Sequence, residues 1–161
     1  MLKLKVSEFL KKASDLHTID TKYPVPERPD GNHSYKFPTD TDNLSDVELE
    51  DWLLFLGGWR GYLGYQISRL EGEQSILSEG FDVLVSSKIA SLEREADKKM
   101  LKESLKGLAL GEDEKLQDLK LRVIEINGEL KILKGRFSLY ESQFETISRL
   151  VTRRGQERFK S

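Results

Sequence analysis

The most regular feature of the chain is a stripe of apolar residues between positions 116 and 151. An apolar side chain recurs after three and then four positions throughout, which fills every a and d site of one heptad register. These sites hold Leu116, Leu119, Val123, Ile126, Leu130, Leu133, Phe137, Tyr140, Phe144, Ile147 and Val151. At 1.5 Å per residue the stripe is roughly 54 Å long, and another helix has to cover it. The pattern predicts a helix over about 113–158.

A second long helix is predicted over about 46–106. Ser45 and Glu48 have the spacing of a capping box, in which each side chain hydrogen-bonds the other residue's amide. The apolar face behind it contains Leu49, Trp52, Leu53, Leu56, Trp59, Leu63, Ile67 and Leu70. Gly107 and Gly111 bracket the expected turn, so the two helices are predicted to form a long antiparallel hairpin.

Three glycines, Gly58, Gly61 and Gly64, recur along one strip of the first predicted helix. Each costs up to about 1 kcal/mol against alanine inside a helix, and close approach by another helix or subunit explains them. The second helix also has surplus apolar residues outside its seam, namely Ile124, Ile132, Leu139 and Leu150. Uncovered apolar surface favours association of identical chains. We therefore expect an all-α homo-oligomeric coiled-coil bundle, with Gly58, Gly61, Gly64, Leu130, Phe137 and Phe144 in oligomerisation.

Residues 1–43 are expected to differ from the helical hairpin of residues 44–161. A short amphipathic helix is predicted within residues 2–16, and prolines at 24, 26, 29 and 38 predict an extended segment over 18–43. Two arrangements of that segment remain open. It is either a mobile linker or a draped loop that packs through Tyr23, Tyr35 and Phe37.

Composition narrows the class of protein. With 161 residues the length suits one domain and a tail, and 34% charged residues suit long amphipathic helices. Cysteine is absent, which excludes disulfides and thiolate zinc sites. No apolar run approaches the roughly 18 residues of a membrane span, and the N-terminus lacks a secretory apolar region. We expect a cytoplasmic protein without membrane partners.

Catalytic chemistry has little support in the sequence. His17 and His33 lie at a helix end and in the proline-rich segment, without a paired carboxylate or serine motif. The acidic residues Glu93, Glu95, Asp97 and Glu103 alternate with basic ones, which is typical of a solvated helix face. A diiron site would need Glu-x-x-His pairs. We predict no enzyme, no metal and no cofactor.

Positive charge is concentrated at the C-terminal end. Residues 1–114 hold 15 basic and 22 acidic side chains, whereas residues 115–161 hold 11 basic and 6 acidic ones. Five of those cations lie close together: Arg149, Arg153, Arg154, Arg158 and Lys160. In a hairpin that turns near residue 110, residue i faces about residue 220 − i. This puts Arg153 beside the stretch that holds Trp59, Arg60, Tyr62 and Tyr65.

Guanidinium groups for phosphates and aromatic rings for bases are what single-stranded nucleic acid binding requires. Two other interpretations remain open. The acidic and basic halves can neutralise each other within the fold, and cations near a helix C-terminus are favourable through the helix dipole alone. In that case Trp59 and Tyr62 are core residues.

Two segments resemble a family of small helical phage proteins related to the UvsY recombination mediators. Residues 43–49 (NLSDVEL) with 59–62 (WRGY) look like the family's opening motif, and residues 147–154 (ISRLVTRR) resemble its closing motif. The resemblance covers about residues 43–157. It implies an oligomer that binds single-stranded DNA through Arg149, Arg153 and Arg154, with residues 59–62 as an aromatic platform. It also implies loading of a RecA-like recombinase onto strands coated by single-strand binding protein, in the host cytoplasm.

A different class of function is the main alternative. A coiled-coil assembly protein, such as a phage scaffold or virion component, would have the same helices and no role with nucleic acid. A third interpretation, a phage inhibitor directed at the host, has no feature of the sequence in its favour.

Overall fold

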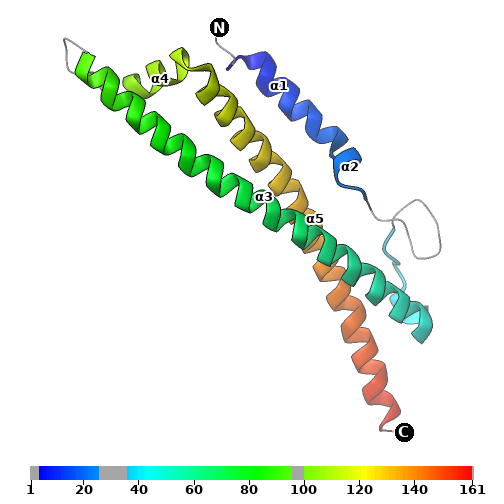
Figure 1. Cartoon of the computed structure of the whole chain (residues 1–161). Helices are drawn as coiled ribbons and strands as arrows, with labels where there is room; N and C mark the ends of the chain where they lie inside the picture. Colours follow the sequence, from blue (N-terminus) through cyan, green and yellow to red (C-terminus); the bar gives the residue numbers. More distant parts are fainter. Residues whose placement is uncertain (1–3, 26–35, 96–99, 161) are drawn as a thin grey trace. The chain divides into compact units, whose positions relative to one another are not determined.

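The computed structural model describes residues 4–25, 36–95 and 100–160, and in these ranges every regular element is a helix (Figure 1). The elements are α1 (Val6–Asp15), η1 (Leu16–Thr18), α2 (Ile19–Lys22), η2 (Thr41–Asn43), α3 (Asp46–Glu95), α4 (Lys102–Glu112) and α5 (Glu114–Arg158). The chain divides into two compact units. Unit 1 comprises Met1–Ile19 and Arg69–Leu130, and unit 2 comprises Asp20–Ser68 and Lys131–Ser161. The predicted all-α class is confirmed.

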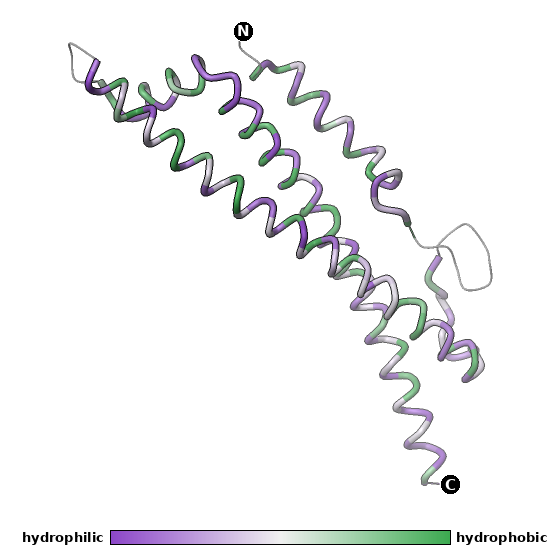
Figure 2. Tube along the Cα trace, viewed as in Figure 1, coloured by the Kyte–Doolittle hydropathy of each residue, from purple (hydrophilic) through white to green (hydrophobic). Residues whose placement is uncertain are grey.

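Helix α5 has nearly the bounds that its heptad pattern predicts. Its hydrophobic positions recur along the helix in Figure 2, and the seam is buried at Leu116, Val123, Ile126, Leu130, Leu133, Tyr140 and Ile147. Only the last seam residue, Val151, is exposed. Asp113 caps the helix, because its Oδ1 accepts from the amides of Lys115 at 2.9 Å and Leu116 at 3.2 Å. The apolar period therefore predicted both the helix and its buried side.

The predicted capping box is present at the start of α3. The Ser45 amide donates to Glu48 Oε2 at 2.7 Å, and the Glu48 amide donates to Ser45 Oγ at 3.3 Å. These hydrogen bonds, first from the Ser45 amide and then from its hydroxyl, hold the pKa of Glu48 below its ordinary value. The first turn of α3 is thus fixed by its own sequence.

The first long helix ends earlier than predicted. Helix α3 ends at Glu95, Leu101 has extended backbone angles, and α4 begins at Lys102 as a separate helix. In unit 1, Leu105 of α4 is buried with Phe81, Val85 and Ile89 of α3 and Leu116 of α5. The prediction of one continuous helix to residue 106 was therefore wrong. Leu105 is buried against α3, which requires α4 to fold back on that helix. The predicted carboxylate Asp97 lies outside the described residues.

The helices of unit 2 pair in a different register from the predicted one. Arg60 contacts Glu141, and Cβ atoms at Gly57 and Gly64 would lie 3.6 and 3.5 Å from the rings of Phe144 and Phe137. In each of these pairs the two residue numbers add to 201. Two pairs within unit 1 also have residue numbers that add to 201, namely Gln74 with Asn127 and Phe81 with Lys120. The predicted sum of 220 was wrong, because the chain reverses direction before α4, which packs back on α3.

Four of the six residues that we assigned to oligomerisation pack inside the chain. Gly64 lies against Phe137, Phe144 lies against Gly57, and Leu130 is buried in unit 1. Gly58 and Gly61 differ from them. They are exposed, and an added Cβ atom at either one would meet nothing within 4 Å.

The N-terminal region is more helical than predicted. Helix α1 lies within the predicted range of 2–16, and in unit 1 it runs beside the first part of α5, where Lys12 Nζ pairs with Glu125 at 3.1 Å (Figure 1). Helical turns continue to Lys22, and Ile19 and Tyr23 are buried. In unit 2, Phe37 packs edge-on against Trp52 at 5.8 Å between ring centroids. The packed arrangement of 18–43 therefore holds for Tyr23 and Phe37.

Some predictions for this region concern residues that the structure does not describe. Leu2, Tyr35, His33 and the prolines at 26 and 29 lie outside the described ranges.

Candidate nucleic-acid interface

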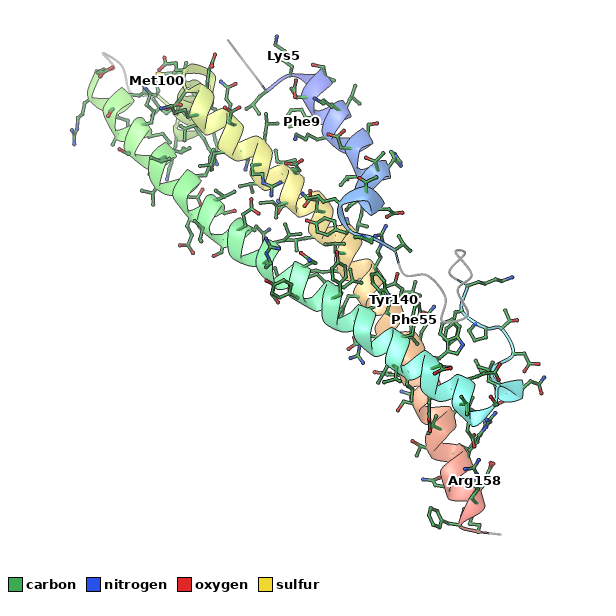
Figure 3. All side chains as sticks on the ribbon, turned by 45° about the vertical axis from the view of Figure 1, so that its right-hand side comes forward. Lys5, Phe9, Phe55, Met100, Tyr140 and Arg158 are labelled. Carbon is green, nitrogen blue, oxygen red and sulfur yellow. The ribbon has the colours of Figure 1, made fainter. Side chains whose placement is uncertain are left out.

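The C-terminal turns of α5 lie beside the start of α3 in unit 2, with Arg158 near the chain end (Figure 3). Arg154 is the most constrained of the arginines. It donates to the carbonyl oxygens of Leu44 and Asp42 at 2.6 and 2.7 Å, and to Asp46 Oδ1 at 3.1 Å. Arg153 donates to Asp42 Oδ1 at 2.7 Å, and Arg158 donates to Asp46. Two aspartates thus contact three of the five predicted cations.

Asp46 is held in its charged form by these contacts. Hydrogen bonds from Arg158 and then from Arg154 lower the pKa of Asp46 below its ordinary value, and their positive charges add to the effect. The carboxylate stays ionised at neutral pH and offers both oxygens to guanidinium groups. Asp46, Arg154, Glu157 and Arg158 together line a shallow open hollow.

The arginines differ in how far they are open to solvent. The Arg154 side chain is 22% exposed, whereas those of Arg149, Arg153 and Arg158 are 83%, 59% and 69% exposed. Phe159 follows Arg158 and is 94% exposed, and Lys160 is exposed as well. Arg154 therefore anchors the end of α5 on α3, while the other cations and one aromatic ring face water.

The aromatic platform is not beside these arginines. Arg60 donates to Glu141 at 3.2 Å and stacks over the Phe144 ring at 4.6 Å, while Trp59 and Tyr62 are half-buried and pack edge-on at 5.4 Å. From Asp46 to Trp59 is roughly 20 Å along a helix. The predicted meeting of Arg153 with residues 59–65 was wrong, because it depended on the register of 220. Arg60, Trp59 and Tyr62 have structural contacts within unit 2 instead.

Sequence reasoning missed Asp42, Asp46 and Phe159. The excess of acidic residues in 1–114 and of basic residues in 115–161 was one signal for the aspartates. An antiparallel pair brings the start of one helix to the end of the other, so the correct turn would have brought the two charge clusters together. Phe159 lies outside the heptad pattern, which is why that pattern gave it no role.

Other kinds of site have no support in the described residues. Among them, no three histidine or acidic side chains come together in a way that could hold a metal ion. None of the helices described contains a stretch that is both long and apolar enough to cross a membrane.

No known protein family matches the chain, and no curated protein or solved structure does either.

Proposed function

We propose that this chain is a single-stranded DNA-binding accessory protein that acts as a recombination mediator in the host cytoplasm. In this role it helps to load a RecA-like recombinase onto strands coated by single-strand binding protein. The observation that carries the proposal is the end of α5, where Arg149, Arg153 and Arg158 are largely exposed next to an exposed Phe159. The resemblance of residues 147–154 to the closing motif of phage mediators supports the same assignment.

The binding step is an exchange of anions. Arg153 and Arg158 donate to Asp42 and Asp46, and a phosphate oxygen accepts the same hydrogen bonds as a carboxylate oxygen. Water screens exposed ion pairs of this kind, so a strand can displace them at small cost. A base then stacks on Phe159, a contact that tolerates any sequence.

Association of several chains strengthens this binding. Each copy brings one basic end, and binding of the first end makes binding of the next one effectively intramolecular. The homo-oligomeric bundle predicted from apolar surface outside the seam is therefore part of the proposal. Arg154 has a supporting role, because it holds the end of α5 to residues 42–46 and keeps the neighbouring arginines in place.

Salt dependence of binding to a fluorescent oligothymidylate tests the proposal. A single strand that contacts three or four phosphates should show a slope of log affinity against log salt of about −2 to −3. Affinity should then fall roughly 20- to 50-fold between 50 and 200 mM salt. Replacing Arg149, Arg153 and Arg158 together with glutamine should remove most of that slope. Fluorescence anisotropy measures both quantities.

A matched control separates this site from net charge. Lys102, Lys106 and Lys131 are exposed and lie elsewhere, so their replacement with glutamine removes the same charge. That variant should bind within about threefold of the wild type. Equal losses in both variants, or no binding by the wild type at 50 mM salt, would contradict the proposal.

The second candidate is a coiled-coil assembly protein without a nucleic-acid role. The observation in its favour is that the basic end already has carboxylate partners in its own chain, at Asp42 and Asp46. On this alternative the arginines serve only to hold α5 to α3. The chain would then self-associate without binding the oligonucleotide at any salt concentration.

A further inference from the structure

Helix α3 has a second apolar face in unit 2, opposite to the one that it buries. Val47, Leu54 and Tyr65 are 67%, 77% and 63% exposed, and Gly58 and Gly61 lie between them on the same side. Leu63 is 1% exposed and lies nine residues after Leu54, which is a rotation of about 180° around a helix. The helix thus has an outer apolar face that is largely exposed to solvent.

The two glycines on the outer face have no role in the chain's own packing. A Cβ atom at Gly58 or Gly61 would meet nothing within 4 Å, whereas at Gly57 and Gly64 it would touch Phe144 and Phe137. Glycine weakens a helix interior, and it is useful there where another backbone approaches closely. Within the described chain no atom fills this space, so Gly58 and Gly61 leave room for the backbone of another molecule.

The order of residues along this face makes it complementary to itself. Glu50, Leu54 and Gly58 are four residues apart, and Gly61, Tyr65 and Arg69 repeat that spacing in mirror order along α3. An antiparallel copy would place Leu54 against Tyr65 of the second copy and the glycines against each other. Glu50 and its neighbour Asp51 would then lie near Arg69 of the second copy.

The charges along this face favour an antiparallel orientation and a second copy of the chain as the binding partner. A parallel copy would bring Glu50 and Asp51 against the same residues of its partner, and like charges in register repel. The antiparallel arrangement pairs opposite charges at both ends and is isologous, so it closes as a two-fold dimer. We propose that a second copy of this chain binds the outer face of α3 in antiparallel orientation, with the two-fold axis between Gly58 and Gly61. The proposal does not depend on DNA binding.

Disulfide trapping tests the orientation directly, because the chain contains no cysteine. Two full-length variants, Leu54→Cys and Tyr65→Cys, are oxidised separately and as a mixture. The antiparallel dimer predicts covalent dimers mainly in the mixture, at least tenfold above either variant alone. Cross-linking of each variant alone indicates a parallel pair and overturns the proposal, as does the absence of cross-links in the mixture. Ser138→Cys, at an exposed position on α5, measures the background from random collisions.

Substitution of the glycines tests the contact without disturbing the fold of one chain. Gly58→Leu with Gly61→Leu fills space that is open within the chain, so helix content by circular dichroism should be unchanged or higher. The dissociation constant of the dimer, measured by analytical ultracentrifugation, should rise at least tenfold. Gly135→Leu is the matched control, since that glycine of α5 is also exposed and open. Equal dimerisation of the glycine variant and the control contradicts the proposal.

Charge reversal adds a rescue. Arg69→Glu alone should weaken the dimer at least tenfold, and adding Glu50→Arg and Asp51→Arg in the same chain should restore it. Failure of the restored chain to dimerise would overturn the antiparallel pairing. Each measurement is made without DNA, so its failure leaves the proposed binding of single strands to be judged by its own titration.

Discussion

Two arginine–carboxylate networks in this chain use the same chemical groups in different ways. In unit 1, Arg122 donates to Glu73 at 2.8 and 3.0 Å and to Glu125 at 2.9 Å, and Lys12 joins Glu125 at 3.1 Å. Burial would raise the pKa of Glu125, yet the hydrogen bonds from Arg122 and Lys12 lower it below its ordinary value. Each of these cations is about a third exposed or less and Glu125 is 24% exposed, so this network is partly shielded from water, although Glu73 is 40% exposed.

The network of unit 2 is open except at Arg154, whose side chain is 22% exposed. Arg153 and Asp42 are 59% and 71% exposed, and Arg158 and Asp46 are 69% and 45% exposed. Water screens such pairs, so the energy gained by each is small and other anions compete for the same donors. The bidentate contacts of unit 1 therefore stabilise the fold. The exposed contacts of unit 2 add little stability, and a ligand can replace them.

Breaking the network of unit 1 should have the largest effect on stability. Arg122→Gln removes a bidentate contact with Glu73 and the bond to Glu125, which should cost about 2 kcal/mol of unfolding free energy. Arg153→Gln, the matched change in unit 2, should cost less than about 0.5 kcal/mol. Urea denaturation followed by circular dichroism measures both. Equal losses of unfolding free energy in the two variants would contradict the proposed difference between the two networks.

Removing the carboxylates of unit 2 should increase DNA affinity. Asp42→Asn with Asp46→Asn takes away the anions that compete with phosphate, and affinity for a single strand should rise roughly tenfold. Glu79→Gln with Asp82→Asn in unit 1 changes net charge equally at exposed positions and should have little effect. Anisotropy titrations of the three proteins at one salt concentration compare them. Unchanged or weaker binding by the first variant would show that the aspartates do not compete with DNA.

Acid should loosen the start of α3 through Asp46. Its pKa is lower in the folded chain than in the unfolded chain, where it is about 3.9. Its contribution to stability is therefore present above that value and is lost as the pH falls through the lowered pKa. The loss of stability between pH 5 and about pH 2 should be smaller in Asp46→Asn than in the wild type, by urea denaturation. Asp51→Asn, at an exposed position of the same helix, is the comparison. If both variants lost equally little unfolding free energy over this pH range, the assignment of the acid effect to Asp46 would be contradicted.

Local parts of the fold could be predicted because their causes lie close together in the sequence. The seam of α5 is visible in its heptad period, and the start of α3 is visible in Ser45 and Glu48. The end of α3 could not be predicted in this way. Apolar residues continue at Met100, Leu101, Leu105 and Leu108, and periodicity alone does not reveal that Leu101 has extended backbone angles.

The error at the turn explains the error at the site. Placing the reversal near Gly107 and Gly111 raised the sum of paired residue numbers from 201 to 220, a shift of 19 positions. Arg153 was therefore expected near residues 59–65, whereas it contacts Asp42. Which side chains meet across an antiparallel pair depends on the position of its turn, which is a property of tertiary packing. The sequence therefore showed that the cations gather at the end of α5, but it did not predict their partners.

Photo-cross-linking of a bound strand tests the central claim most directly, namely that the exposed end of α5 contacts single-stranded DNA. An oligonucleotide with photoreactive thymine analogues is bound to the full chain and irradiated, and the modified peptides are identified by mass spectrometry. The account predicts adducts within residues 149–160, with Phe159 as the principal site, and their loss with excess unlabelled strand. Adducts confined to residues 59–62 or to unit 1, or no adduct at all, would contradict it.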